Sequence, residues 1–151
     1  RKRLEGLDRF ARTKSRADEG IYTAQATEAT YHRLASLAGT IVAGGYAALV
    51  DATHLSRSQR ALIGDAARRA QVPCIIVNCH APKDVLETRV ADRTIKGRDV
   101  SEADLRILQR QLETMEPVEP QECEVIIDVD TSTDIELDQL VARILEACQC
   151  S

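Results

Sequence analysis

The stretch Tyr46-Ala47-Ala48-Leu49-Val50-Asp51-Ala52-Thr53 is an apolar run that ends in a carboxylate. Two glycines precede it, and its four central apolar residues are too few for a helix. Residues 47–50 are therefore predicted to form a short buried strand. Similar apolar runs occur at 74–79 and 125–127, which are predicted to be the second and third strands.

Helical patterns separate these runs. Apolar residues at spacings of three and four predict helices over 26–42, 56–70, 82–93, 104–115 and 137–148. Ser56 with Gln59 has the spacing of a capping box, Pro82 suits a first helical position, and Pro117 ends the fourth helix. Strands alternating with helices indicate right-handed crossovers and a parallel sheet covered on both faces. The predicted class is α/β, with residues 1–151 as a single domain.

Composition is that of a globular domain. Of the 151 residues, 44% are hydrophobic and 29% are charged, which makes disorder an unsuitable description. No apolar run approaches the roughly 20 residues needed to cross a bilayer, and no signal-type segment opens the chain. We expect no membrane partner and a cytoplasmic location.

The net charge of −4 is unevenly distributed. Residues 1–16 carry seven basic and two acidic side chains, a local charge of +5, so the remainder carries −9. These basic N-terminal residues can bind phosphate groups, or they can form the solvent-exposed face of a helix. Both interpretations stay open at this point.

Asp51 is the best-placed acidic residue. In open parallel sheets, ligands bind beyond the carboxyl ends of the strands, where Asp51, His80 and residues 128–130 are predicted to lie. A carboxylate at the end of an apolar strand can hold Mg²⁺ directly or through water. Alternatively, Asp51 caps the following turn through Thr53.

A cluster of cations follows the second strand. Arg89 and Arg93 are four residues apart, so they project from one helix face, and Lys96 and Arg98 lie just beyond. Arginine forks match the oxygens of a phosphoryl group, so the cluster suits phosphoryl transfer, with residues 94–104 as a lid segment. The alternative is a solvated surface on which these cations pair with Glu87, Asp92 and Asp99.

Taken together, these features resemble a known family. They are similar to the P-loop kinase-like group of AAA family ATPases, the zeta toxin- and polynucleotide kinase-like predicted kinases that are often fused to an aminoglycoside phosphotransferase-like domain. The residues that carry the resemblance are Arg1-Lys2-Arg3-Leu4, Gly6, Tyr22, Ala26-Thr27, Thr30-Tyr31, Val50 to Thr53, Arg60, Glu87-Thr88-Arg89, Arg93, Arg98 to Leu105, and Glu116-Pro117.

The resemblance implies ATP and Mg²⁺ as cofactors and a small-molecule or nucleotide hydroxyl as the phosphate acceptor. It implies that Asp51 is the metal carboxylate, that Arg93 contacts the transferring phosphate, and that Lys96 and Arg98 assist. Arg89, Thr131 and Ser132 would border the adenine. Arg1, Tyr22 and Arg60 would face the acceptor.

The resemblance also implies missing parts. The 151 residues contain no G-x-x-x-x-G-K-[ST] phosphate loop, and the group's catalytic base would precede Arg1. We therefore expect an N-terminally truncated P-loop NTPase three-layer sandwich that lacks its first two strands. In that topology another strand separates residues 47–50 from 74–79. The alternatives are a truncated or degenerate domain that only binds a nucleotide or partner, and a polynucleotide 5′-end kinase.

Overall fold

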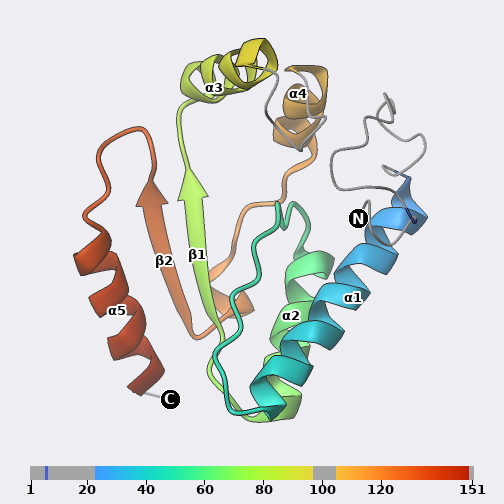
Figure 1. The fold of residues 1–151 in the computed structure, drawn as a ribbon, viewed down its shortest axis with the longest axis vertical. Coiled ribbons are helices and arrows are strands. Elements are labelled where there is room, and N and C mark those ends of the chain that lie inside the picture. The colour runs from blue at the N-terminus through green and yellow to red at the C-terminus, as the bar shows by residue number, and fades with distance from the viewer. Residues whose placement is uncertain (1–5, 7–22, 97–104, 150–151) are drawn as a thin grey trace.

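The structure is a computed structural model, and it describes residues 6, 23–96 and 105–149 (Figure 1). The described residues form α-helices, two strands and one short 3-10 helix. In chain order they are α1 (Ala24–Ala43), α2 (Arg57–Ala70), β1 (Ile75–His80), α3 (Lys83–Lys96), α4 (Leu105–Thr114), η2 (Pro120–Glu122), β2 (Val125–Asp130) and α5 (Leu137–Gln149).

Local sequence signals set the ends of the first two helices. Thr23 caps α1 by accepting a hydrogen bond from the Ala26 N–H at 3.1 Å, and α1 ends at Gly44. The predicted capping box of α2 is present, with Ser56 and Gln59 bonded in both directions. Gln71 then ends α2 in the left-handed conformation, with φ of 55°. The predictions for both helices are thus confirmed.

The sheet of the described residues consists of β1 and β2, which run parallel. Their register pairs Ile75 with Val125 at one end and His80 with Asp130 at the other. Ile127, at the centre of β2, is 2% exposed and is the most deeply buried large side chain. Because the strands end level with each other, the residues that follow His80 and Asp130 meet at one edge, as predicted.

The prediction of a buried strand at 47–50 is wrong. The structure assigns no strand there, and Leu49 is 94% exposed. A strand is defined by ladder hydrogen bonds to a neighbour, and within the described residues neither β1 nor β2 pairs with this segment.

The helices occupy three places around the sheet. Figure 1 shows α3 and α4 beyond the arrowheads of the strands, α1 and α2 together on one side, and α5 beside β2 on the other. α1 and α2 pack through small side chains, with Ala35, Ala38 and Ala66 buried. α5 buries Ala147, but it leaves Leu137, Val141 and Leu145 more than half exposed. Across the described ranges, no helix combines the length and the apolar character needed to span a bilayer.

Candidate functional site

The carboxyl ends of β1 and β2 are tied together by the residues that follow β2. Thr131 donates to the His80 carbonyl from its backbone N–H at 2.8 Å and from its hydroxyl at 3.0 Å. One carboxylate oxygen of Asp130 accepts from the backbone N–H of Ser132 at 2.8 Å and from its hydroxyl at 2.6 Å. These two bonds hold the pKa of the Asp130 carboxyl below its usual value. The residues that follow β2 therefore form a polar loop that hydrogen bonds hold against the end of the sheet.

Arg89 reaches this loop from α3. Its Nη1 donates to the Thr131 hydroxyl at 2.9 Å, and its Nη2 donates to the Thr131 carbonyl. Arg93, one turn further along α3, directs its Nε to the Arg89 carbonyl at 3.4 Å. The structure thus brings together Arg89 and Thr131, which are 42 residues apart in the chain. Ser132 and Arg93 lie next to this pair.

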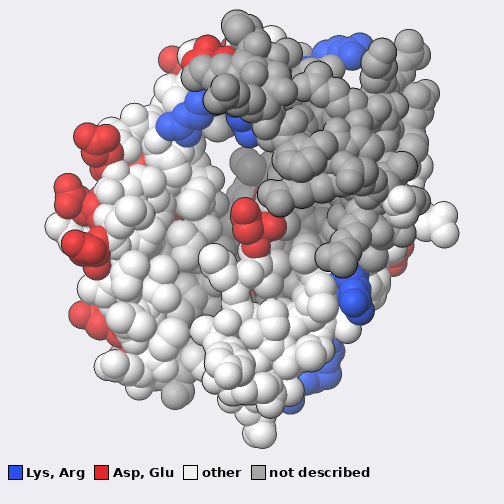
Figure 2. Space-filling model, viewed as in Figure 1, with Lys and Arg blue, Asp and Glu red and all other residues white. Residues whose placement is uncertain are grey.

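Asp51 lies in an irregular segment, which we call the Asp51 segment (residues 51–55). Its side chain is exposed and makes no hydrogen bond or ion pair with any residue that the structure describes. The Thr53 hydroxyl pairs instead with the Tyr31 hydroxyl, at 3.3 Å, so the alternative that Asp51 caps its turn through Thr53 is not observed. In the view of Figure 2, acidic and basic side chains lie on opposite sides of a hollow in the surface.

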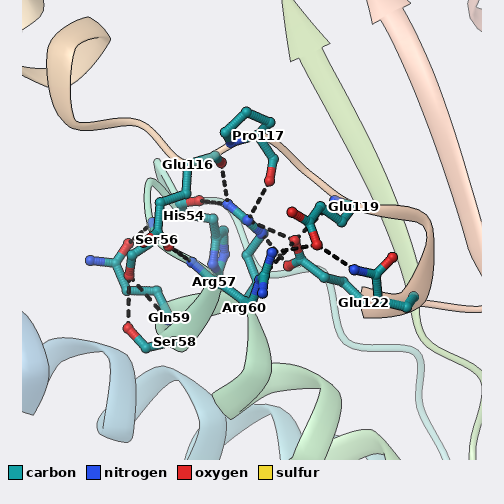
Figure 3. A network of polar contacts seen from close by, with 11 residues as sticks. His54, Ser56, Arg57, Ser58, Gln59, Arg60, Glu116, Pro117, Glu119 and Glu122 are labelled. Atoms are coloured by element: carbon teal, nitrogen blue, oxygen red, sulfur yellow. Dashed lines mark hydrogen bonds and ion pairs between the residues drawn. The ribbon is translucent and has the colours of Figure 1, made fainter.

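Arg60 is the most extensively bonded side chain in the described residues. It comes from α2, is 8% exposed, and lies at the centre of the network in Figure 3. Its Nε and Nη2 donate to the two carboxylate oxygens of Glu122 at 2.6 and 2.8 Å. Its Nη1 donates to the carbonyls of His54 and Glu116 at 2.9 and 3.0 Å, and its Nη2 donates to that of Pro117 at 3.0 Å. Binding of an acceptor by Arg60 would have to displace one of these bonds.

His54 is the strained residue of the Asp51 segment. Its φ of 46° is left-handed, and its ring packs edge-on against Tyr31, with 5.2 Å between centroids. Its Nδ1 is buried and has no partner among the described residues. Burial lowers the pKa of His54 below its usual value, against the opposing effects of the Val50 carbonyl and the Asp51 charge. The folded protein therefore favours a neutral ring here.

This lowered pKa predicts a pH-dependent stability. Below about pH 6.5 the unfolded chain takes up a proton at His54 that the folded chain resists, so the free energy of unfolding should rise as pH approaches that value and level off above it. We expect His54→Asn, which tolerates positive φ, to remove this component. Urea denaturation of both proteins between pH 5 and 8 measures it. Identical pH profiles would contradict the prediction.

Other predicted site residues lie outside the part of the chain that the structure describes. These are Arg1, Tyr22 and Arg98, together with the basic opening at 1–16 and most of the 94–104 lid segment. Lys96 is the last residue of α3, and only its backbone is described. In the alternative interpretation these cations pair with nearby carboxylates, but Glu87 pairs with Lys83 at 3.7 Å and Arg89 bonds to Thr131. Asp99 lies outside the described residues.

The side chains that the structure describes suit Mg²⁺, which needs few protein ligands, better than a metal ion that is held entirely by protein side chains. Within the described ranges, no three His, Cys, Asp or Glu side chains are grouped closely enough to hold a metal ion. Mg²⁺ commonly keeps several waters and uses one or two carboxylates plus substrate phosphates. The exposed carboxylate of Asp51 fits that pattern.

A family model described as an AAA domain matches residues 1–118. The chain belongs to this AAA domain family. The match identifies it as a P-loop NTPase-like, nucleotide-binding domain of a kinase- or ATPase-like class, for which nucleotide and usually Mg²⁺ are the expected ligands. The helices and the parallel strand pair of the chain agree with an α/β P-loop-like fold. None of the curated proteins matches it.

Proposed function

We propose that this AAA domain forms most of a kinase that transfers the γ-phosphoryl group of ATP to a hydroxyl of a small molecule or nucleotide. The observation that carries the proposal is the docking of the Arg89 guanidinium on Thr131 at the carboxyl ends of the strands. In α/β sheets this edge is where ligands bind. The Arg89 side chain is exposed there, so one face of its planar guanidinium is available for a base.

On the nucleotide side, Arg89, Thr131 and Ser132 would border the adenine. The two bonds from Arg89 to Thr131 hold the guanidinium in a fixed plane, and a planar cation packs well against an aromatic ring. Because Thr131 is itself bonded to the His80 carbonyl, the strand ends fix the position of this pair.

On the phosphate side, Asp51 would hold Mg²⁺, directly or through water, and Arg93 would contact the transferring phosphoryl group. Mg²⁺ bound there would neutralise charge on the phosphates. Arg93 is one helical turn from Arg89 on α3, so the two can contact adjacent parts of one nucleotide. Lys96 and Arg98 would assist from the lid segment at 94–104.

The remaining assignments of the proposal are Arg1 and Tyr22 at the acceptor, an intact three-layer sandwich and a cytoplasmic location. Arg60 would support the acceptor side indirectly, since its five N–H donors are used in internal bonds. The phosphate loop would come from residues outside these 151, and a phosphotransferase-like domain could be fused to the same chain. Phosphoryl transfer depends mainly on positioning and charge stabilisation, so the described side chains would bind and orient rather than form covalent intermediates.

Replacing Arg89 tests the nucleotide side. In the complete reading frame that contains this chain, Arg89→Ala should raise the KM for ATP about 10-fold, with a smaller change in kcat, because a ground-state contact is lost. Arg33→Ala, an exposed arginine on α1, is the matched control. Steady-state kinetics with varied ATP provide the measurement. An unchanged KM for ATP would remove Arg89 from the site.

The alternative proposal is a domain that binds a nucleotide or a protein partner without catalysis. ATP binding by the complete protein, with no transfer to any hydroxyl and no hydrolysis, would favour this second function over the kinase.

A further inference from the structure

The Asp51 segment has no helix or strand of its own, and α1 holds it from one side. The buried Tyr31 hydroxyl accepts the His54 backbone N–H at 2.9 Å and pairs with the Thr53 hydroxyl at 3.3 Å. Tyr31 is only 3% exposed, so its position is fixed by packing. These bonds therefore hold the side chain of Thr53 and the backbone of His54, two and three residues after Asp51.

The segment that follows α4 holds the Asp51 segment from the side opposite to α1. The Glu116 backbone N–H donates to the Leu55 carbonyl at 2.8 Å, and the Glu116 carboxylate accepts the Arg57 backbone N–H at 2.5 Å. Since α4 comes directly after the predicted lid segment, these bonds join the chain beyond the lid to the chain beyond Asp51. The two regions are about 60 residues apart in sequence.

Arg60 completes this connection. We call Arg60, Glu122 and the carbonyls of His54, Glu116 and Pro117 the Arg60 clasp (Figure 3). A guanidinium has five N–H donors in a rigid fork, and the clasp uses five bonds from its three nitrogens. One side chain thus sets the distance between the Asp51 segment and the segment 116–122.

A pair of apolar side chains could fill this volume but could not set that distance. Buried ion pairs add little net stability compared with well-packed apolar residues. Arg60 and Glu122 have side chains that are 5% and 7% exposed, and their bidentate contact orients the fork. The orientation then aims Nη1 at two carbonyls from different segments. Compared with apolar packing, the ion pair therefore adds a fixed relative position of the two segments.

We propose that Arg60 is a positioning residue that, together with Glu122, holds the backbone of the Asp51 segment in place for Mg²⁺ binding and couples this segment to the one beyond α4. The metal part of this inference rests on the proposed function, whereas the coupling of the two segments does not. Arg60 acts through backbone carbonyls and makes no contact with the reacting atoms.

The test uses Arg60→Lys and Glu122→Gln in the complete protein, with Arg68→Lys as the control. Arg68 lies on the same helix, its side chain is 72% exposed, and it pairs only locally with Asp65. Lysine keeps the charge of Arg60 but lacks the planar fork, and glutamine keeps the shape of Glu122. Two readouts are needed, namely hydrogen exchange of the amides at His54 and Glu116 and the affinity of the ATP-loaded protein for Mn²⁺ measured by electron paramagnetic resonance.

We expect Arg60→Lys and Glu122→Gln to accelerate exchange at both amides and to weaken Mn²⁺ binding about 10-fold, the usual effect of losing an outer support of a metal ligand. The affinity for ATP without metal should not change. Arg68→Lys should leave both readouts at the wild-type values. A merely structural role would lower the melting temperature without changing Mn²⁺ affinity in the folded protein.

The outcomes separate this inference from the kinase proposal. Faster exchange at His54 with wild-type exchange at Glu116 would overturn the coupling. Unchanged Mn²⁺ affinity in both variants would overturn the positioning role. If the wild-type protein binds Mn²⁺ and ATP but transfers no phosphoryl group, the kinase proposal fails. The same two readouts still decide whether Arg60 positions the Asp51 segment and couples it to the segment beyond α4.

Discussion

Replacing Arg60 by methionine is expected to lower the free energy of unfolding by about 3 kcal/mol, because removing one partner of a buried ion pair leaves the other charge uncompensated. Glu122, whose side chain is 7% exposed, would lose its bidentate partner. Three backbone carbonyls would lose donors as well. Urea denaturation of wild type and variant at pH 7 measures the difference.

The pH dependence and a double variant sharpen this prediction. The hydrogen bond from Arg60 holds the pKa of Glu122 below its usual value, so its stabilising effect is present above about pH 4.3 and is lost as pH falls through the lower, folded value. The gap between wild type and Arg60→Met should therefore narrow in acid. Arg60→Met with Glu122→Met should be more stable than Arg60→Met alone. A loss under 1 kcal/mol at pH 7 would show that the ion pair is dispensable.

Replacing Arg93 by alanine is expected to lower kcat about 1,000-fold if the domain is a kinase, because an arginine on the transferring phosphate acts mainly in the transition state. Arg93 is exposed on α3 one turn beyond Arg89, so its loss should disturb the fold little. The KM for ATP should change much less than kcat. Single-turnover phosphoryl transfer provides the measurement.

The contrast with Arg89 is the control for this second prediction. Arg89→Ala should act mainly on KM, whereas Arg93→Ala should act mainly on kcat, although both remove one exposed arginine from the same helix. Arg93→Lys should recover part of the rate, since it keeps the charge without the bidentate fork. If turnover with Arg93→Ala equals that of wild type, the assignment of Arg93 to the transferring phosphate is wrong.

The sequence alone could predict those parts of the fold that depend on local signals. The capping box at Ser56 and Gln59 places the start of α2, Gly44 ends α1, and α4 ends shortly before Pro117. Each signal acts within a few residues of the boundary it sets. Strands β1 and β2 were predicted with ends shifted by a few residues, because apolar runs mark buried segments but not their hydrogen-bonded limits.

The segment 47–50 shows why the same reasoning failed there. Its apolar pattern matches a buried strand, but a strand also needs a neighbour, and that condition lies elsewhere in the chain. The site shows the same limit. The family resemblance implied only that Arg89 and Thr131 both border the adenine, and their direct contact was not predicted. Glu122 was not predicted as the partner of Arg60 because the two are 62 residues apart. The buried Tyr31 hydroxyl and the left-handed His54 gave no recognisable signal in the sequence, although Tyr31 lies in a run that carried the resemblance.

The register of β1 with β2 has a consequence for the order of events during synthesis. Asn78 is bonded to Asp128, 50 residues later, and β2 is the only strand that pairs with β1 in the described ranges. At a translation rate of roughly 5–20 residues per second, several seconds separate the synthesis of β1 from that of its partner. During this interval the β1–β2 ladder is absent, so the edge of β1 that β2 later covers stays open and can bind chaperones until β2 leaves the ribosome.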